Sequence, residues 1–403
     1  MGRHRSRLKR ALDVKSKLFR LSRWLTLGQP ALRRLWSFYP ELKMPDARRV
    51  RVIHRSAHAH PWRGPDYAQQ RAFVLQNNVD SQTASDWSAM DATERYVAII
   101  DDVLVPGHRV TPVDPKTGAQ ISSDGARLTT WNKARPSISA LQTRQLASDL
   151  TIVIPRMTHF GHLLTDVLMP QFFALQLLGF SEGRRLCVVT SEKPVGLILA
   201  FIGTLRHAGY EVTHVPAQVW ETIRAPKLLY ATTHARNLEL KFATPEALDF
   251  ARTHLLAALP APPEPLPKRI FLLRGATRTR HVEGEMELAK KLEALGFVAM
   301  VGRWSNLAEQ IAAFRDAEIV VGAHGAGLAN ILWSGPKTLL IEICAANARK
   351  TTGLHWASSV GADYFALTGS DEGALQNFSL DPEAAFSAIK TMIEHRASQK
   401  ARA

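Results

Sequence analysis

Apolar residues in the second half of the chain fall into short continuous runs separated by segments with helical periodicity. Four continuous runs predict strands that are buried on both faces: 269–274, 297–301, 318–323 and 338–343. Three intervening segments predict helices: 284–295, 307–315 and 326–333. This alternation predicts a parallel sheet covered by helices, as in a Rossmann-like lobe.

The first half of the chain shows a similar alternation, preceded by less regular segments. Strands are predicted at 150–156, 185–191 and 210–215, and helices at 162–178 and 195–207. Short strands are expected within 72–113, an irregular connector at 43–65 and a polar loop at 118–134. The first half therefore predicts a second Rossmann-like layer.

Five prolines between residues 258 and 268 predict a semi-rigid linker between the two layers. The expected fold is α/β, with two facing Rossmann-like lobes and a cleft between them. Four units are predicted: a leader at 1–42, an amino-terminal lobe at 43–257, the linker at 258–268 and a carboxyl-terminal lobe at 269–403.

Composition and charge refine this picture at the amino terminus. The 403-residue chain is 46% hydrophobic and 22% charged, which is typical of a globular protein. Its formal net charge is +15, and the first forty residues hold eleven Lys or Arg against the single acid Asp13. Leu, Phe and Trp lie between these basic residues, which predicts a basic amphipathic leader that binds an anionic membrane surface. A solvated tail is the alternative, and nucleic acid is not an expected partner because no motif that reads it is present.

The cellular location follows from two further observations. No apolar run reaches eighteen residues, so no membrane span is predicted. Cys187 and Cys344 lie far apart in apolar runs, which predicts buried thiols, no disulfide and a reducing compartment. We expect a cytoplasmic protein that is peripheral on the inner face of the membrane.

A glycine-rich turn at Gly322–Gly327 joins a predicted strand to a predicted helix. Such a turn directs backbone N–H groups toward a ligand, and the helix dipole favours an anion there. Gly325 and Gly327 allow close approach of a phosphate, His324 can donate a hydrogen bond to it, and Glu342 is placed to accept from ribose hydroxyls. The glycines do not have the dinucleotide spacing G-x-G-x-x-G, so a simple packing turn is the alternative.

Three arginines follow the strand at 269–274, at its carboxyl end. Arg274, Arg278 and Arg280 lie within seven residues and can clamp a pyrophosphate. The alternative is a solvated basic loop.

With these residues the chain resembles the carboxyl-terminal half of family 61 glycosyltransferases. The matching parts are Arg274 with Arg280, Glu285, Glu309-Gln310, His324–Leu328, Asn330 and Glu342, and the segment from His159 is similar less closely. Departures are Gly284, Ala329 and Lys337, where the family commonly has Asn, Thr and Gly. The resemblance implies a GT-B arrangement, inverting sugar transfer, a donor site on the carboxyl-terminal lobe and an acceptor site on the other. The predicted nucleotide-sugar-binding residues are Arg274, Arg278, Arg280, His324, Gly325, Ala326, Gly327, Asn330 and Glu342.

A second candidate site lies where a predicted strand gives way to a helix. His162 and Asp166 are four residues apart and share a helix face, near His159. Inverting transfer needs a base for the acceptor hydroxyl, and we predict Asp166 first and His162 second as that catalytic base. In the structural alternative, Asp166 is a carboxylate favoured by the helix dipole and the histidines are core residues.

No Asp-x-Asp triplet of the kind that holds a divalent cation occurs in the chain. Asp101-Asp102 and Asp316-Ala317-Glu318 lie in predicted strand contexts and are interpreted as structural. We therefore predict neither a metal nor a cofactor, with Arg and His neutralising the departing diphosphate.

The leading hypothesis is a metal-independent, inverting glycosyltransferase that acts on a lipid-linked glycan in surface or capsular polysaccharide assembly. The alternatives are a nucleotide-sugar epimerase and a non-catalytic nucleotide-sugar-binding component of a polysaccharide complex. A serine hydrolase is disfavoured: residues 179–183 match G-x-S-x-G, but a predicted helix precedes them and a strand follows, the reverse of a nucleophile elbow.

The leader gives the first testable prediction. Deleting residues 1–40 should release the protein from anionic liposomes in a sedimentation assay, because the deletion removes eleven basic residues and the apolar residues between them. Neutral liposomes are the control. Binding that survives the deletion would place the attachment elsewhere in the chain.

Overall fold

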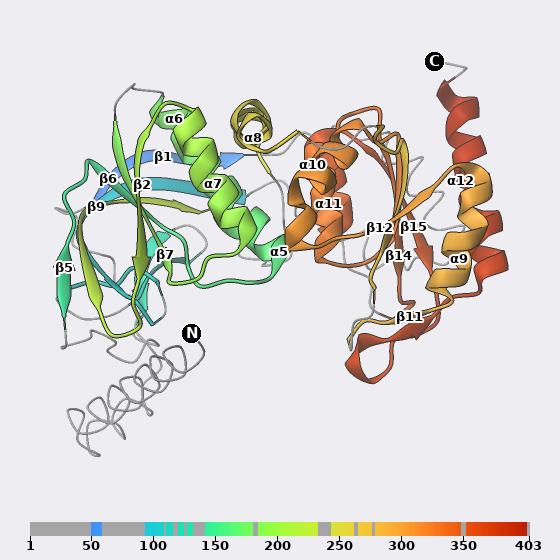
Figure 1. Cartoon of the computed structure of the whole chain (residues 1–403), viewed down its shortest axis with the longest axis horizontal. Coiled ribbons are helices and arrows are strands. Elements are labelled where there is room, and N and C mark those ends of the chain that lie inside the picture. The colour runs from blue at the N-terminus through green and yellow to red at the C-terminus, as the bar shows by residue number, and fades with distance from the viewer. Residues whose placement is uncertain are drawn as a thin grey trace, which may run out of the picture.

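Two α/β lobes, each built around its own sheet, lie along the longest axis of the molecule in the computed structural model (Figure 1). The structure describes residues 50–58, 93–108, 110–115, 120–124, 127–131, 142–179, 184–232, 243–261, 265–275, 279–347 and 352–400. The leader lies outside these residues.

The amino-terminal lobe contains a mixed sheet of seven strands in the order β1-β2-β9-β6-β7-β8, with β5 paired to β9. β5, β6, β7 and β8 run parallel to β9, whereas β2 is antiparallel to both β1 and β9. The strands are β1 Val50–His58, β2 Thr93–Pro106, β5 Thr143–Gln145, β6 Leu150–Val153, β7 Arg185–Ser191, β8 Glu211–Ala217 and β9 Thr222–Thr232, with a separate hairpin of β3 Gln120–Asp124 and β4 Arg127–Trp131. The helices are α5 Phe160–His162, the π-helical turn η3 Leu163–Leu168, α6 Met169–Leu178, α7 Gly196–His207 and α8 Pro245–Ala258.

The carboxyl-terminal lobe contains a parallel sheet in the order β12-β10-β13-β14-β15. Its strands are β10 Arg269–Leu273, β12 Val298–Val301, β13 Ile319–Ala323, β14 Leu339–Cys344 and β15 Asp363–Thr368, with a small pair of β11 Val282–Glu283 and β16 Phe378–Ser379. Its helices are α9 Glu285–Leu292, η4 Glu293–Leu295, η5 Trp304–Asn306, α10 Leu307–Asp316, η6 Ala326–Trp333, α11 Thr352–Val360, η7 Ala374–Gln376 and α12 Pro382–Lys400. The chain passes from β10 to β12 on one side and returns to β13 on the other, so a topological switch point lies between β10 and β13.

Helices cover both faces of the carboxyl-terminal sheet (Figure 1). In β13, Val320 packs into the cluster that includes α10 and η6, while Val321 packs into the cluster that includes α9 and α12. Because successive side chains point to opposite faces, both faces of this strand must be apolar. This burial confirms the expectation drawn from the continuous apolar runs.

The cluster on the α10 side continues into the amino-terminal lobe. It includes Phe172, Phe201 and Phe250, from α6, α7 and α8, together with Phe314 and Trp333 from α10 and η6. The ring centroids of Phe172 and Phe250 are 5.6 Å apart in a stacked arrangement. An apolar layer of helices therefore joins the two sheets.

The α/β class and the two parallel series of strands and helices are confirmed, and both cysteines are buried and free. The interpretation of 43–65 as an irregular connector was wrong for Val50–His58, because this edge strand takes its hydrogen bonds from β2 and needs no continuous apolar run. The interpretation of 118–134 as a loop was wrong as well. The hairpin β3–β4 occupies that segment. Gly125 and Ala126 separate its strands in the sequence, and a glycine at the first position of a two-residue connection is a hairpin signal.

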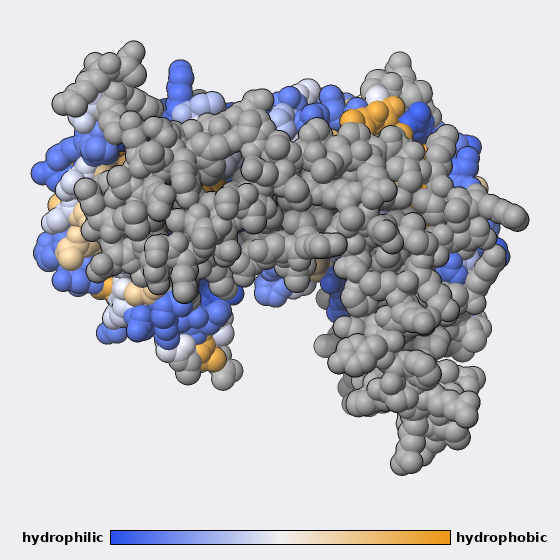
Figure 2. Space-filling model, turned by 180° about the vertical axis from the view of Figure 1, so that it is seen from behind, coloured by the Kyte–Doolittle hydropathy of each residue, from blue (hydrophilic) through white to orange (hydrophobic). Residues whose placement is uncertain are grey.

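The GT-B arrangement and the domain limits stay predictions. Within the described ranges, no helix combines the length and the apolar character that a membrane crossing requires. Seen from behind, described side chains on the surface are largely hydrophilic and apolar ones form small separate patches (Figure 2).

A matched pair of glycines gives a prediction about the carboxyl-terminal lobe. Gly284 and Gly296 both have left-handed backbones, with φ of 87° and 77°. A Cβ on Gly284 would lie 2.4 Å from the carbonyl oxygen of Leu380, whereas one on Gly296 would meet nothing within 4 Å. We expect Gly296→Ala to lower the unfolding free energy by about 1 kcal/mol through backbone strain. Gly284→Ala should cost a further ~2 kcal/mol because β11 and β16 must separate.

Chemical unfolding of both variants measures the difference. Equal losses would show that Gly284 is needed only for its backbone angle.

Candidate functional site

The residues predicted to bind an anion converge at the switch point between β10 and β13. Arg274 directly follows β10 and His324 directly follows β13. Nη1 of Arg274 donates a hydrogen bond to the carbonyl oxygen of His324 at 3.1 Å. Gly325 has an extended backbone, and a Cβ there would lie only 1.7 Å from the same nitrogen. The guanidinium therefore lies directly against the glycine-rich turn.

The charge of Arg274 has no acidic partner within ion-pair distance among the described residues. Its Nε is buried without a hydrogen-bond partner. Burial lowers the pKa of Arg274, and the charge of Arg280 lowers it further, while Glu285 acts in the opposite direction. The guanidinium nevertheless keeps its proton at neutral pH. The switch point thus holds a partly buried positive charge, which is suited to an anionic ligand.

Glu285, the nearest acid, is used to fix the main chain. Its Oε1 accepts the backbone N–H of Arg274 at 2.9 Å. Burial raises the pKa of Glu285, although hydrogen bonds from the backbone and the charge of Arg274 oppose that shift. This carboxylate anchors the end of β10.

Arg280 is held beside the switch point by the loop that precedes β16. Its Nε donates to Oε1 of Gln376 at 2.7 Å, and its backbone N–H donates to the carbonyl of Leu375 at 2.8 Å. Arg280, Leu375 and Gln376 have φ of 58°, 69° and 61°, a region that non-glycine residues rarely occupy. Each such residue costs on the order of 1–3 kcal/mol, and strain of this kind gathers at functional sites. Sequence reasoning missed Gln376, which lies far from Arg280 along the chain.

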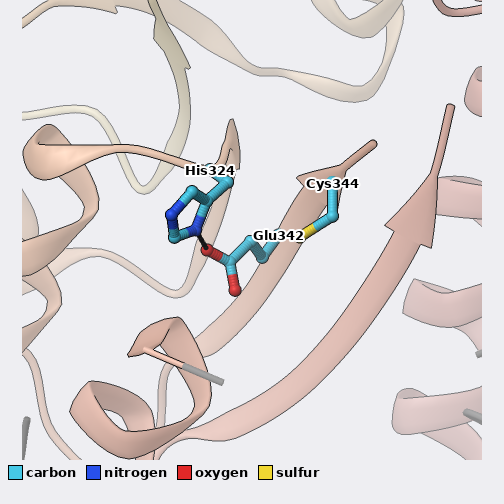
Figure 3. Close-up of side chains that lie close together, drawn as sticks. All are labelled: His324, Glu342 and Cys344. Atoms are coloured by element: carbon cyan, nitrogen blue, oxygen red, sulfur yellow. Dashed lines mark hydrogen bonds and ion pairs between the residues drawn. The ribbon is translucent and has the colours of Figure 1, made fainter. Parts of the chain in front are cut away.

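His324 is tied to a buried carboxylate (Figure 3). Its Nδ1 lies 2.7 Å from Oε1 of Glu342, and the hydroxyl of Tyr364 donates to Oε2 of Glu342 at 2.7 Å. The side chain of Glu342 is 0% exposed and that of His324 is 16% exposed. The sequence predicted a ribose contact for Glu342, but this carboxylate presents no surface to a ligand and instead holds the ring of His324.

Asn330 has a similar internal role. It is completely buried, and its Nδ2 donates to the carbonyl of Gly327 at 3.0 Å, while Oδ1 accepts from Nε1 of Trp333 at 3.2 Å. The same Nδ2 also donates to Oε1 of Gln310 at 3.3 Å. Asn330 therefore shapes the turn, although the sequence placed it among the residues that contact the donor. Arg278 lies outside the described residues.

The atoms of His324, Glu342 and Cys344 that can bind a metal lie within 4.8 Å of one another. Figure 3 shows Cys344 on the same strand as Glu342, with its sulfur directed toward the carboxylate. His324 and Tyr364 already occupy both carboxylate oxygens through hydrogen bonds. These hydrogen bonds account for the positions of His324 and Glu342, and the absence of a metal stays a prediction.

The second predicted pair is also formed. Nδ1 of His162 lies 2.8 Å from Oδ2 of Asp166, and the hydroxyl of Thr165 lies 2.8 Å from Oδ1. Asp166 and Thr165 belong to the π-helical turn between α5 and α6, a feature frequent at functional sites. The side chain of His162 is 58% exposed and that of Asp166 is 20% exposed. The imidazole thus faces solvent, with the carboxylate behind it.

The two sites adjoin where the lobes touch. A Cβ on Gly161 would lie 3.3 Å from Cα of Ala326, so the start of the helix that carries His162 packs on the turn that carries His324. Arg252 of α8 strengthens this contact by donating to the carbonyl oxygens of Leu332 and Ser334 at the end of η6. The structure therefore brings together motifs that the sequence placed on separate lobes.

Residues 160–341 match the family described as Glycosyltransferase 61. This match supports a glycosyltransferase. The matched residues begin at α5 and end within β14, so the glycosyltransferase segment contains both the His162–Asp166 pair and the Arg274–His324 turn. No curated protein matches the chain.

The close approach of Arg274 to Gly325 gives a sharp prediction for this glycosyltransferase. Gly325→Ala should displace the guanidinium without unfolding the turn, because the clash is with the end of a side chain and the backbone is extended. We expect the affinity for inorganic pyrophosphate, measured by calorimetry, to fall about tenfold, as in Arg274→Ala, which corresponds to ~1.4 kcal/mol.

Gly335→Ala is the control, since a Cβ there meets nothing within 4 Å. In the double variant, Gly325→Ala should add no loss to that of Arg274→Ala. Additive losses would mean that the turn binds the anion independently of Arg274.

Proposed function

We propose that this glycosyltransferase is an inverting, metal-independent enzyme that moves a sugar from a nucleotide-sugar donor to a glycan acceptor. The observation that carries the proposal is the contact of Gly161 with Ala326. Through it, a candidate base on one lobe adjoins a cationic turn on the other. Transfer requires these two functions on opposite sides of the anomeric carbon.

The cationic turn fits the diphosphate of the donor. Arg274 and Arg280 supply positive charge at the switch point, and His324 lies beside them on a fixed ring. The N–H groups of Ala326 and Gly327 belong to the first turn of η6, where backbone donors have no partner within the helix, and they add to this field. As the sugar–phosphate bond breaks, these groups stabilise the negative charge on the departing nucleoside diphosphate, the task that a divalent cation performs elsewhere.

The hydrogen bonds of the second pair favour His162 as the catalytic base, with Asp166 orienting it. Both oxygens of Asp166 are engaged by His162 and Thr165, while Nε2 of His162 has no hydrogen-bond partner among the described residues. This arrangement reverses the order in which the sequence ranked the two residues. Asp166 and His162 resemble the carboxylate–imidazole pairs of other enzymes, in which the carboxylate fixes the orientation and the tautomer of the ring.

The reaction then follows in one displacement. The acceptor hydroxyl oxygen attacks the anomeric carbon while its proton passes to Nε2 of His162. The bond between that carbon and the phosphate oxygen breaks, and its electron pair leaves with the nucleoside diphosphate. Attack from the side opposite the leaving group inverts the configuration.

We further propose a lipid-linked glycan acceptor at the cytoplasmic face of the membrane, in surface or capsular polysaccharide assembly. The basic amphipathic residues 1–40 support this part of the proposal, because a peripheral enzyme with such a leader meets an acceptor held in the same anionic surface.

Transfer assays with radiolabelled nucleotide sugars and a membrane extract test the function, and His162→Ala tests the base. We expect kcat to fall by about 10²–10⁴ in His162→Ala, with donor affinity unchanged. Asp166→Asn should cause a smaller fall, because it misorients the ring but keeps it.

His159→Ala is the matched control, since its exposed ring lies edge-on to His162 at 6.1 Å. A larger loss in Asp166→Asn would make Asp166 the base. Conversion of the donor without an acceptor would indicate an epimerase, and neither transfer nor donor hydrolysis would contradict the proposal.

A further inference from the structure

We infer that Tyr364 is a positioning residue of the donor site, which acts on His324 through the carboxylate of Glu342. This inference rests on the proposed donor site and extends it. Tyr364 and Glu342 lie after residue 341, where the family match ends. Two residues beyond the family match, Glu342 on β14 and Tyr364 on β15, would thus complete the proposed donor site.

The three side chains form a continuous hydrogen-bonded chain across neighbouring strands. Tyr364 lies on β15, Glu342 on β14, and His324 follows β13. Each of the two hydrogen bonds measures 2.7 Å. Because one partner holds each carboxylate oxygen, the carboxylate plane is fixed, and so is the direction in which Oε1 meets Nδ1 of His324.

The hydroxyl can act only as a donor in this chain. Burial raises the pKa of Tyr364 well above its usual value, and the charge of Glu342 raises it further. The phenol therefore stays protonated, and its proton points to Glu342. The other ring nitrogen of His324, Nε2, lies on the side of the ring away from the carboxylate (Figure 3).

Space around the carboxylate is restricted. A Cβ on Gly353 of α11 would lie only 2.3 Å from Oε2 of Glu342, so any other residue at that position would collide with it. Among the described residues, His324 and Tyr364 are the hydrogen-bond partners of Glu342, and its side chain has no exposed surface. Removing the hydroxyl leaves Oε2 unpaired where water does not reach, which is costly for a charged group. The carboxylate then turns and takes His324 with it.

Tyr364→Phe tests the inference because it removes one oxygen and keeps the ring. We expect the donor KM and the dissociation constant of inorganic pyrophosphate to rise about tenfold, with kcat and the acceptor KM unchanged within about threefold. Glu342→Gln should change the same two constants in the same direction. In a His324→Ala background, Tyr364→Phe should add no further loss.

Ile343→Val is the matched control: Ile343 lies on the same strand, is as deeply buried as Glu342 and packs on the opposite face of the sheet, so the donor constants should stay unchanged. A lower melting temperature with an unchanged donor KM would make Tyr364 merely structural and overturn the inference. One equivalent of zinc in the wild type, lost in Cys344→Ala, would overturn it in favour of a metal site. If the wild type binds pyrophosphate but Tyr364→Phe binds it equally well, the inference alone fails; if the wild type binds none, the donor site fails as well.

Discussion

The positive charges of Arg274 and Arg280 are the feature around which the carboxyl-terminal site is arranged; burial lowers the pKa of Arg274, and the charge of Arg280 lowers it further. Both guanidinium groups donate to neutral acceptors. Arg274 donates to the carbonyl of His324, and Arg280 donates to the side-chain amide oxygen of Gln376. Three left-handed non-glycine residues maintain the second of these contacts. Neighbouring like charges and a strained backbone destabilise the folded protein locally. An anionic ligand between the two arginines would reduce that cost. In the proposed donor site, a diphosphate between the ends of β10 and β13 would account for both the strain and the unpaired charge.

The position of His162, the proposed base, relative to Arg274 and Arg280 depends on the packing of apolar side chains. One cluster runs from α6, α7 and α8 into α10 and η6, and the close contact of Gly161 with Ala326 lies at its edge. The π-helical turn begins directly after His162, and the spacing of four residues places Asp166 beside His162 on one helix face. Close packing leaves little freedom for this geometry, because cores resist small displacements. The alignment of the proposed base with the proposed leaving-group site thus depends on the packing of the core.

Much of this fold could be predicted because parallel strands carry a strong signal. Burial on both faces makes β13 and β14 continuous apolar runs, which cannot be confused with solvated loops. The edge strand β1 and the hairpin β3–β4 have no such requirement, and they were missed. Helix α8 was missed too, although Thr244 and Pro245 begin it with a cap, in which the Thr244 side chain accepts the N–H of Ala247.

The sequence predicted that the candidate residues converge but not which of them hold the others in place. Parallel strands end at one edge of a sheet, so Arg274 and His324 had to converge there. Glu342 and Asn330 are equally suited by residue type to bind a ligand. Whether they do depends on Tyr364 and Trp333, whose contacts are set by the packed structure and carry no signal in the sequence. Burial without free hydrogen-bonding capacity turns a binding residue into an orienting one. The same reasoning applies on the other lobe, where Thr165 and His162 contact the two oxygens of Asp166, and the exposed imidazole is the proposed reactive group.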